Sequence, residues 1–245
     1  MRVAVFSDIH GNCVAFDSVL SDIEKQSVDG MVCLGDAIQG GAQPAEVVSR
    51  LRQLRVPTVM GNADYWLATG TANTAKEPVS SAQLEVRTWS LSKLNGEDLD
   101  FIGQFKPIIT LPFSDDGLVC FHGSPTSFDE QIWPTTPEEE FFRMVGGYGN
   151  SVLCGGHVHL QYTRRLKDSF FFNPGSVGFS WNHAQTGDEL VADNWAEYAI
   201  VTSNGKSSNL EFRKVPFDAK EWIRVTVDSG KPHADRVSRE YSTRT

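Results

Sequence analysis

Side chains that can bind metal ions recur in this 245-residue chain where a short apolar run ends beside glycine. Each run has the length of a buried strand, and glycine permits the sharp turn that follows. Open α/β sheets bind ligands outside the carboxyl ends of their strands. In chain order, the candidate residues are Asp8, His10, Asp36, Asn62, His122, His157 and His159.

The spacing and chemistry of these residues predict one shared metal centre. Asp8 and His10 are two residues apart, as are His157 and His159, so in extended backbone both members of each pair project to the same side. Carboxylate, imidazole and amide ligands without thiolate suit Mn, Fe, Zn, Co or Ni rather than a structural zinc. Seven candidates exceed the needs of one ion. They leave room for two divalent ions that share a bridging carboxylate.

A single histidine after a strand is more often a structural residue, and a single GD or GN is usually a turn. The prediction therefore depends on the joint pattern, which includes four of the six histidines.

The elements that must position these residues follow an α/β pattern. Apolar runs at 2–6, 31–34 and 58–60 predict strands, and periodic apolar positions at 16–23 and 47–54 predict helices between them, the first capped by Asn12. This alternation favours a parallel sheet covered by helices. We expect a surface loop at 66–80 and a helical stretch at 81–105 that breaks at 95–96.

The second half of the chain is predicted to be richer in strands. The expected strands are 108–111, 118–121, 151–154, 162–166, 170–172, 198–202 and 209–215, and a helix at 138–145 interrupts them. We expect an α/β protein with two mixed sheets packed face to face and helices outside, in a single domain at 1–227. Residues 228–245 are polar and are predicted to form a mobile tail.

Composition narrows the classes of protein. A net charge of −9, spread along the chain, argues against extended nucleic-acid binding and against an anionic membrane surface. We find no secretion signal and no run long enough to span a membrane, so a cytoplasmic protein is expected. The cysteines form no CxxC pair, which excludes zinc–thiolate and thioredoxin-like sites and predicts buried free thiols. Oligomeric state is not predicted.

The ordered motifs resemble those of the calcineurin-like metallophosphoesterase superfamily. Its pattern DxH, GD, GN, HG and GHxH reads DIH, GD, GN, HG and GHVH here, over residues 8–159. The stretch NPGSVG at 173–178 is similar to one in the small bacterial and archaeal phosphodiesterase-like branch. The resemblance implies a four-layer α/β/β/α sandwich, the metallo-dependent phosphatase fold, with a binuclear centre. By motif, Asp8, His10, Asp36 and His159 would hold one ion, and Asp36, Asn62, His122 and His157 the other.

The resemblance also implies a reaction. Two ions about 3.5–4 Å apart would lower the pKa of a bridging water, and the resulting hydroxide would attack phosphorus. No Ser, Cys or His nucleophile is needed, and Asp36, Asn62 and His122 would form the catalytic core with the ions. We expect a small or nucleotide-like phosphate ester as substrate. Manganese is the first expectation for the metal, with Fe, Zn, Ni, Co or Mg as alternatives.

Two departures from the family pattern bear on the substrate. Many members carry a histidine where this chain has Ala63, and a positioned general acid is worth about 10²–10⁴ in rate. Its loss favours phosphodiesters or activated monoesters. The second motif, GDAIQGG, lacks the arginine of protein phosphatases and dinucleoside tetraphosphatases, which argues against those activities.

Further residues near the motifs leave alternatives open. The loop 179–195 is predicted to lie near the site and to shape a substrate pocket. Its His183 is a candidate replacement for the missing acid, and an exposed loop histidine is the alternative. Asp64 either supports the ligands or serves as a plain turn residue.

A non-catalytic protein-binding scaffold on the same fold is the alternative function. A eukaryotic retromer subunit resembles this branch and serves as a scaffold, having lost part of its metal set. Every expected ligand position is filled by a competent residue here, which favours the enzyme. A nuclease of the superfamily would need a basic groove or an added domain, and neither is evident in the sequence.

Overall fold

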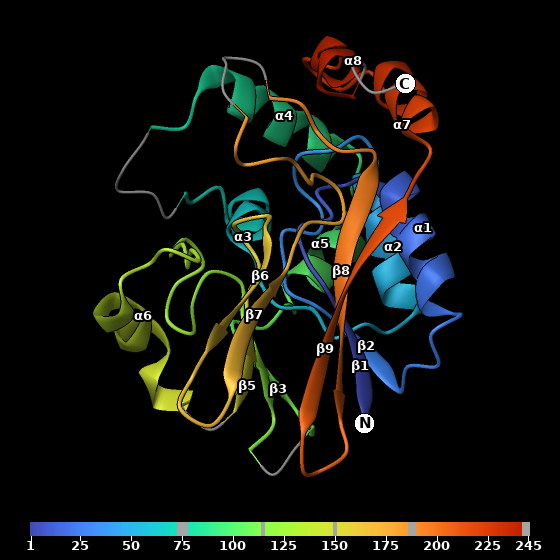
Figure 1. The fold of residues 1–245 in the computed structure, drawn as a ribbon. Helices are drawn as coiled ribbons and strands as arrows, with labels where there is room; N and C mark the ends of the chain where they lie inside the picture. Colours follow the sequence, from blue (N-terminus) through green and yellow to red (C-terminus); the bar gives the residue numbers. More distant parts are fainter. Residues whose placement is uncertain (73–77, 114–115, 149–150, 186–189, 242–245) are drawn as a thin grey trace.

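Two β-sheets lie face to face in the computed structural model, which describes residues 1–72, 78–113, 116–148, 151–185 and 190–241 (Figure 1). The four-stranded sheet has the order β2 (Gly30–Cys33), β1 (Arg2–Phe6), β8 (Trp195–Ser203) and β9 (Ser208–Pro216). The five-stranded sheet has the order β3 (Ile109–Leu111), β4 (Leu118–Cys120), β5 (Val152–Cys154), β7 (Phe170–Pro174) and β6 (Gln161–Arg165). Both sheets mix parallel and antiparallel pairs, as predicted.

Strand β1 shows how the layers arise. Successive side chains of a strand point to opposite faces, so Val3 and Val5 pack between the two sheets, whereas Ala4 and Phe6 face helices on the outer side. A third apolar layer lies on the outer side of the five-stranded sheet, where α6 (Glu138–Val145) packs. Helices outside and two sheets inside make four layers, which confirms the predicted α/β/β/α sandwich.

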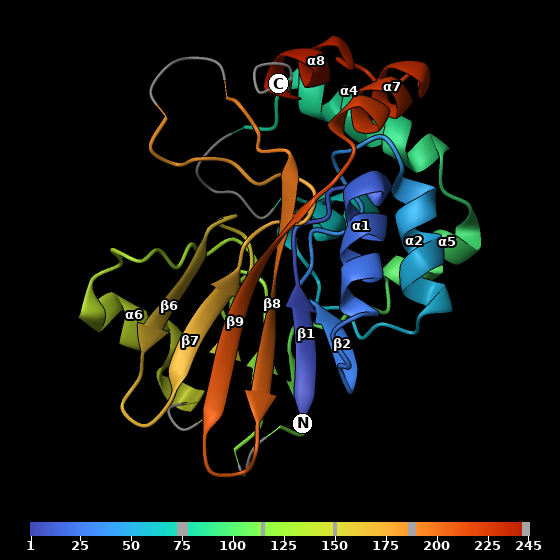
Figure 2. The same cartoon turned by 45° about the vertical axis from the view of Figure 1, so that its right-hand side comes forward.

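Helix α1 (Cys13–Ile23) follows β1 and covers the four-stranded sheet beside α2 (Pro44–Gln53), as Figure 2 shows. The Asn12 side chain caps α1 by accepting a hydrogen bond from the backbone N–H of Ala15 at 3.0 Å. The remaining helices are α3 (Asn62–Thr69), α4 (Ser81–Ser92), α5 (Gly96–Ile102), α7 (Ala219–Asp228), α8 (Asp235–Tyr241) and a short 3₁₀ turn, η1 (Gly146–Tyr148).

Two local predictions differ from the structure. The segment 58–60 pairs only at single points, since Thr58 bridges Cys33 and Val59 bridges Lys106, so it connects neighbours without forming a full strand. The loop predicted at 66–80 begins later, because α3 continues to Thr69. Residues 73–77 of that loop lie outside the described residues. The helical break at 95–96 is confirmed, with Asn95 capping α5.

The predicted mobile tail is wrong for the part of it that the structure describes. Residue 227 falls inside α7, and α8 packs against α7. Val237 and Tyr241 are buried, and the Tyr241 hydroxyl donates a hydrogen bond to the Gly178 carbonyl at 3.1 Å. These two residues are four apart and therefore share one helix face. The residues between them are polar, so the average composition of the segment did not reveal this apolar face. The single-domain assignment stays a prediction.

The cysteines agree with the sequence analysis, since all four are free and buried. Burial raises the pKa of the Cys13 thiol to about 12, so this cysteine beside the first motif is protonated and unreactive at neutral pH. None of the helices in the described part of the chain combines the length and the hydropathy of a transmembrane span.

Candidate metal centre

Two groups of ligand-bearing side chains meet where the strands end. Each group holds its ligand atoms within 4.8 Å of one another. We name them the first cluster, consisting of Asp8, His10 and His159, and the second cluster, consisting of Asp36, His122 and His157. They follow β1, β2, β4 and β5. The carboxyl end of β1 points toward the end of the molecule that carries α4, α7 and α8 (Figure 2).

The first cluster brings nitrogen lone pairs face to face. His10 Nδ1 lies 2.9 Å from the Gln39 carbonyl, and His159 Nδ1 lies 2.8 Å from the Phe179 carbonyl. A carbonyl only accepts, so both Nδ1 atoms carry protons and, in the neutral rings, both Nε2 atoms carry lone pairs. These two Nε2 atoms are 3.1 Å apart. A cation that both nitrogens can bind relieves this repulsion.

Asp8 completes the first cluster with an unsatisfied oxygen. Its side chain is fully buried, and Asp8 Oδ1 lies 3.2 Å from His159 Nε2 and 3.7 Å from His10 Nε2. This oxygen has no hydrogen-bond partner among the described residues, whereas Oδ2 accepts from the backbone N–H of His157 at 3.1 Å. A buried carboxylate oxygen beside two imidazole lone pairs is the donor set that a divalent cation requires.

The second cluster repeats this design. His122 Nδ1 donates to the Leu34 carbonyl at 2.9 Å, which leaves Nε2 facing Asn62 Oδ1 at 3.0 Å and Asp36 Oδ2 at 3.3 Å. The His157 ring lies 5.1 Å from the His122 ring, centroid to centroid. An imidazole nitrogen, an amide oxygen and a carboxylate oxygen therefore converge on one point.

Asp36 stands between the clusters. Its Oδ2 lies 3.3 Å from His122 Nε2 in the second cluster and 4.0 Å from His10 Nε2 in the first. The other oxygen, Oδ1, accepts from the backbone N–H of Ala63 at 2.8 Å. One carboxylate thus reaches a histidine of each group, which is the position of a bridging ligand.

The backbone at the site is strained. Five of the six cluster residues have positive φ: Asp8, His10, Asp36, His157 and His159, at 47–74°. Left-handed backbone is uncommon for residues other than glycine and costs of order 1–3 kcal/mol each. Such strain gathers at sites where the surrounding structure holds side chains for a function, and it marks this loop system as the site.

Glycines let the loops approach closely at two positions. A Cβ at Gly61 would lie 2.1 Å from Asp36 Oδ1, and a Cβ at Gly156 would lie 2.1 Å from Ser7 Oγ and 2.9 Å from Asp8 Oδ2. All three contacts are shorter than a Cβ atom tolerates, so glycine is required at both positions.

The segment 173–178 holds the loops of the first cluster. The Ser176 hydroxyl donates to the Asp8 carbonyl at 2.8 Å, and the Asn173 amide donates to the Gly156 carbonyl at 2.6 Å. Asp64 acts in the same way after β2: it is fully buried and accepts from the backbone N–H groups of Ala37 and Ile38, both at 2.9 Å. Asp64 therefore supports the turn that carries Asp36.

The electrostatics keep both bridging and terminal carboxylates ionised. Burial opposes ionisation of Asp36, but His122 and His10 lower its pKa to about 2. For Asp8, burial is again outweighed, mainly by His159, and its pKa lies well below the ordinary range. Burial and the neighbouring His122 lower the pKa of His157 to about 4, so its ring is neutral at pH 7. Anionic carboxylates and a neutral imidazole are the forms that bind metal ions.

His122 differs from His157 in its protonation. Burial lowers its pKa, but Asp36 and Asp8 outweigh burial and raise the pKa to about 9. The ring must lose this proton before Nε2 can bind a cation, so metal binding at the second cluster is coupled to proton release.

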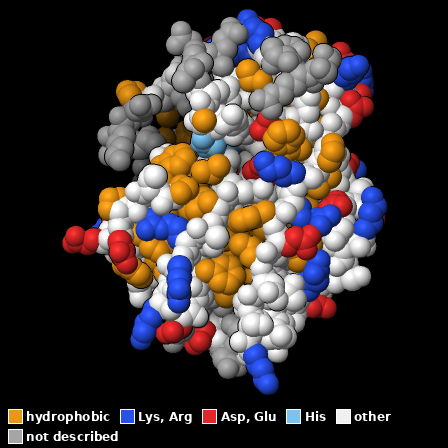
Figure 3. Space-filling model, in the orientation of Figure 1, with side chains coloured by type: hydrophobic (Ala, Val, Ile, Leu, Met, Phe, Trp, Pro, Cys, Tyr) orange, Lys and Arg blue, Asp and Glu red, His pale blue; other side chains and the backbone are white. Residues whose placement is uncertain are grey.

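A cavity of about 710 Å³ opens over the clusters. Its floor includes His10, Asp36, Asn62, His157 and His159. Apolar side chains of α3, α4 and the C-terminal helices form much of its wall, and Figure 3 shows histidine surface bordered by hydrophobic side chains on one face of the molecule.

Gln39 is a polar wall residue that the sequence analysis did not single out. It lines the cavity, is 5% exposed, and its Oε1 has no hydrogen-bond partner among the described residues. The loop after β2 places Gln39 beside His10. In the sequence, the only indication of this residue was the unusual motif GDAIQGG, which contains it.

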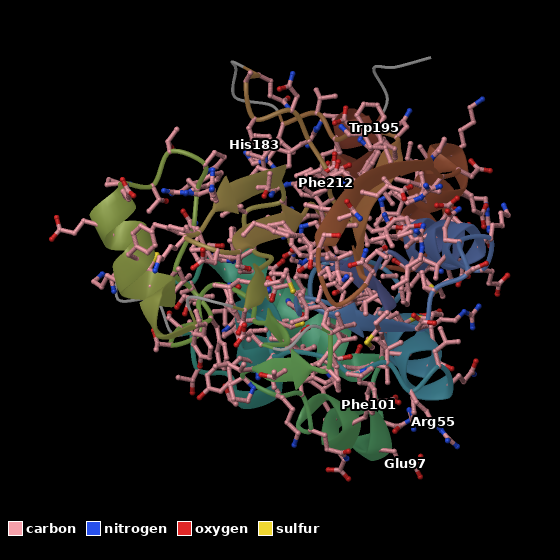
Figure 4. The ribbon with its side chains drawn as sticks, turned by 60° about the horizontal axis from the view of Figure 1, so that its bottom comes forward. Arg55, Glu97, Phe101, His183, Trp195 and Phe212 are labelled. Carbon is pink, nitrogen blue, oxygen red and sulfur yellow. The ribbon has the colours of Figure 1, made fainter. Side chains whose placement is uncertain are left out.

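His183 lies beside the site without joining either cluster. Its ring stacks on Trp181 with centroids 3.8 Å apart, and His183 Nε2 lies 3.2 Å from the His159 carbonyl. It sits on the side of the molecule that carries Trp195 (Figure 4). Contacts of Phe179 and His183 with His159 confirm that the loop 179–195 is near the site, although residues 186–189 lie outside the described part. An acid role for His183 stays a prediction.

Two candidate metal-binding clusters lie at the strand ends of an α/β/β/α sandwich. The model of the calcineurin-like phosphoesterase superfamily domain matches residues 1–192. The chain belongs to that superfamily, whose members are generally phosphoesterases that use divalent metals.

Similar proteins extend over nearly the whole chain. An uncharacterized protein of Methanocaldococcus jannaschii is 25% identical over 238 residues, covering 94% of this chain and 93% of the relative. A metallophosphoesterase from Sphaerobacter thermophilus has a TM-score of 0.74 at 23% identity, covering 98% of both chains. A hypothetical protein from Pyrococcus horikoshii has a TM-score of 0.81 at 19% identity, covering 98% of this chain and 97% of that one. The two structures establish the shared fold.

Proposed function

We propose that this protein is a binuclear metal-dependent phosphoesterase that hydrolyses a small phosphate ester, with a diester preferred. The observation that carries the proposal is the position of Asp36, whose Oδ2 lies within 4.0 Å of a histidine nitrogen in each cluster. One ion would be held by Asp8, His10, Asp36 and His159, and the other by Asp36, Asn62, His122 and His157.

Two bound divalent ions would supply Lewis acidity, which activates water and stabilises charge on a phosphate ester. The protein's own residues orient that chemistry. Backbone carbonyls fix the tautomers of His10, His122 and His159, so each Nε2 points at its ion position. The Asn62 amide oxygen faces His122 Nε2 at 3.0 Å, and the NH₂ group of Asn62 would meet a phosphate oxygen.

Charge supports the binding of an anion in an acidic protein. Asp8 and Asp36 are the carboxylates of the two clusters, so two divalent ions would leave the centre with a net positive charge before any substrate binds. A phosphate oxyanion is attracted by that local charge, despite a net charge of −9 for the whole chain.

The wall beside Asn62 supports the preference for a diester. Ala63 lines the cavity and offers no proton to a leaving group, so a substrate with a poor leaving group, such as an alkyl monoester, loses about 10²–10⁴ in rate. Manganese is the proposed ion, since oxygen and nitrogen ligands without thiolate suit it.

A protein-binding scaffold on the same fold is the rival function. A scaffold of this kind is expected to have lost some of its metal-binding side chains. Here each cluster keeps its ligand atoms within 4.8 Å of one another. The intact donor sets therefore favour the enzyme.

A metal-resolved activity assay tests the proposal. Purified chain, stripped of metal and resupplied with Mn, Fe, Zn, Ni, Co or Mg, is assayed on bis(p-nitrophenyl) phosphate and on p-nitrophenyl phosphate. We expect turnover only with metal and faster turnover of the diester. Asp36→Asn keeps the side-chain shape and should abolish turnover. Metal-independent hydrolysis, or full activity in that variant, would refute the proposal.

A further inference from the structure

The C-terminal segment forms one wall of the cavity above the clusters. Lys231, Arg236 and Glu240 line it, together with the aromatic side chains of Trp222 and Tyr241. All of them lie beyond residue 192, where the match to the superfamily domain ends. Figures 1 and 2 show α7 and α8 packed beside α4 over the end of the molecule toward which β1 points.

This wall is anchored to the site. The Tyr241 hydroxyl donates to the Gly178 carbonyl at 3.1 Å, and Gly178 itself donates through its N–H to the Asp8 carbonyl at 2.9 Å. The backbone N–H of Ala192 donates to the Glu240 carbonyl at 2.8 Å. The position of α8 is therefore tied through one residue to a ligand of the first cluster.

Lys231 and Arg236 on this wall form no ion pair with a carboxylate among the described residues. By contrast, Arg239, the other arginine of α8, pairs with Asp235 at 3.4 Å. Lys231 is half-buried, and burial lowers the pKa of its ammonium. Arg236 is exposed at the cavity rim. Glu240 is the nearby carboxylate that raises the Lys231 pKa, so the three groups together carry one net positive charge.

We propose that Lys231 and Arg236 form a second anion site, which selects phosphate esters that carry another anionic group, a phosphate or a carboxylate, away from the scissile phosphate. The scissile phosphate would lie at the clusters, the linking part of the substrate along the apolar wall, and the second anion at Lys231 and Arg236. This inference rests on the proposed function and adds the substrate class.

The physical reason is the cost of the half-buried ammonium. A cation partly removed from water regains its lost solvation when an anion binds it, and a charge-assisted hydrogen bond is about twice as strong as a neutral one. The apolar residues Trp66, Val79 and Val86 also line the cavity and offer no charge to either end of the substrate. Distance between the two anionic groups, as well as their charge, would therefore be selected.

Calorimetric titration of the manganese-supplied protein tests the second site. The probes are methylphosphonate, alkane-α,ω-diphosphonates of increasing chain length, and ω-carboxyalkylphosphonates of matching lengths. We expect one chain length to bind about tenfold tighter than methylphosphonate. The carboxylate series distinguishes a site for any anion from one that requires a second phosphate.

Four variants test whether Lys231 and Arg236 cause the tighter binding of probes with two anionic groups. Lys231→Met and Arg236→Met keep apolar bulk and should each remove most of the preference for two anions, whereas Lys231→Arg should retain it. Arg239→Met removes the same charge from the same helix outside the cavity and should leave the preference unchanged. The ratio of kcat/KM for esters with and without a second anionic group should fall in the same two variants.

The outcomes separate the two proposals. If no diphosphonate binds better than methylphosphonate, or if the gain survives in both methionine variants, the second site is refuted while metal-dependent hydrolysis of nitrophenyl esters stands. If methylphosphonate does not bind and no ester is hydrolysed with any metal, the proposed function fails and the second site fails with it.

Discussion

The Nε2 atoms of His10 and His159 lie 3.1 Å apart, each on a ring whose Nδ1 is bonded to a backbone carbonyl. Two lone pairs held this close need a shared proton or a cation between them. The unsatisfied Asp8 Oδ1 lies 3.2 Å from one of these nitrogens, which makes a divalent cation the better match to the donor set.

We therefore expect His159→Ala to lose one of the two ions. Substitution of residues behind a ligand already costs about 10–100-fold in metal affinity or activity, so removal of the ligand itself should reduce diesterase activity by at least that factor. Metal content per chain, measured by elemental analysis, and kcat/KM check the expectation. His183→Ala is the matched control for metal content, because His183 contacts the His159 carbonyl without joining a cluster. Equal ion content in the two variants would contradict the assignment.

Asp64 provides a test of how the turn after β2 is held. Asp64→Asn keeps one acceptor oxygen and turns an NH₂ group toward a backbone N–H of Ala37 or Ile38. We expect the free energy of unfolding to fall by about 1–3 kcal/mol and the metal affinity of the second cluster to fall about 10–100-fold. Denaturation and metal titration measure both. Asp168→Asn, at an exposed side chain, should change neither; an Asp64 variant that behaves like it would show that Asp64 is a plain turn residue.

The link between α1 and β9 gives a pH dependence. Asp22 accepts from Arg213 Nε and from the Tyr198 hydroxyl, both at 2.7 Å, and the hydrogen bond from Arg213 is the main cause that lowers the Asp22 pKa below its ordinary value of 3.8. A lowered folded-state pKa stabilises the fold above the ordinary value, and this stabilisation is lost as pH falls through the folded-state pKa.

Asp22→Asn should therefore lower the free energy of unfolding by about 1–2 kcal/mol at pH 7, with the difference from wild type shrinking in acid. Urea denaturation across a pH series measures this. Asp228→Asn, which disrupts an exposed ion pair with Arg224, should cost much less. A difference that stays constant down to strongly acidic pH would contradict the assignment to Asp22.

Tyr241 tests whether the C-terminal helix is part of the folded core. Tyr241 is 5% exposed, and its ring packs against Phe217 with centroids 6.0 Å apart. Tyr241→Ala should cost about 3–5 kcal/mol of unfolding free energy, and Tyr241→Phe about 1 kcal/mol for the hydroxyl. Thermal and urea denaturation measure both. If the alanine variant were as stable as wild type, the result would instead support a mobile C-terminal tail.

Sequence reasoning found the cluster residues because local rules place them. His122 directly follows an apolar run, Asp8 lies one residue beyond another, and the glycines of both motifs are visible in the sequence. The apolar runs and the order of strands and helices likewise predicted two mixed sheets packed face to face. These features depend on neighbours in the chain, so a pattern of a few residues is enough.

What the sequence did not reveal depends on contacts between distant segments. Lys231 and Tyr241 belong to a stretch of polar composition, and only its packing over Gly178 makes it a wall of the site. His183 shows the converse case: its neighbourhood was predicted, but its ring direction is decided by stacking on Trp181. Helix α3 was not predicted either, because its second half was assigned to a loop together with the small polar residues after Thr69.

Crystallographic anomalous scattering from manganese-soaked protein tests the central claim most directly. We predict two peaks, one among Asp8, His10 and His159 and one among Asn62, His122 and His157, with Asp36 contacting both. Asp36→Asn should lose at least one of them. A single peak, or no peak between these side chains in protein that has been supplied with metal, would contradict the binuclear centre.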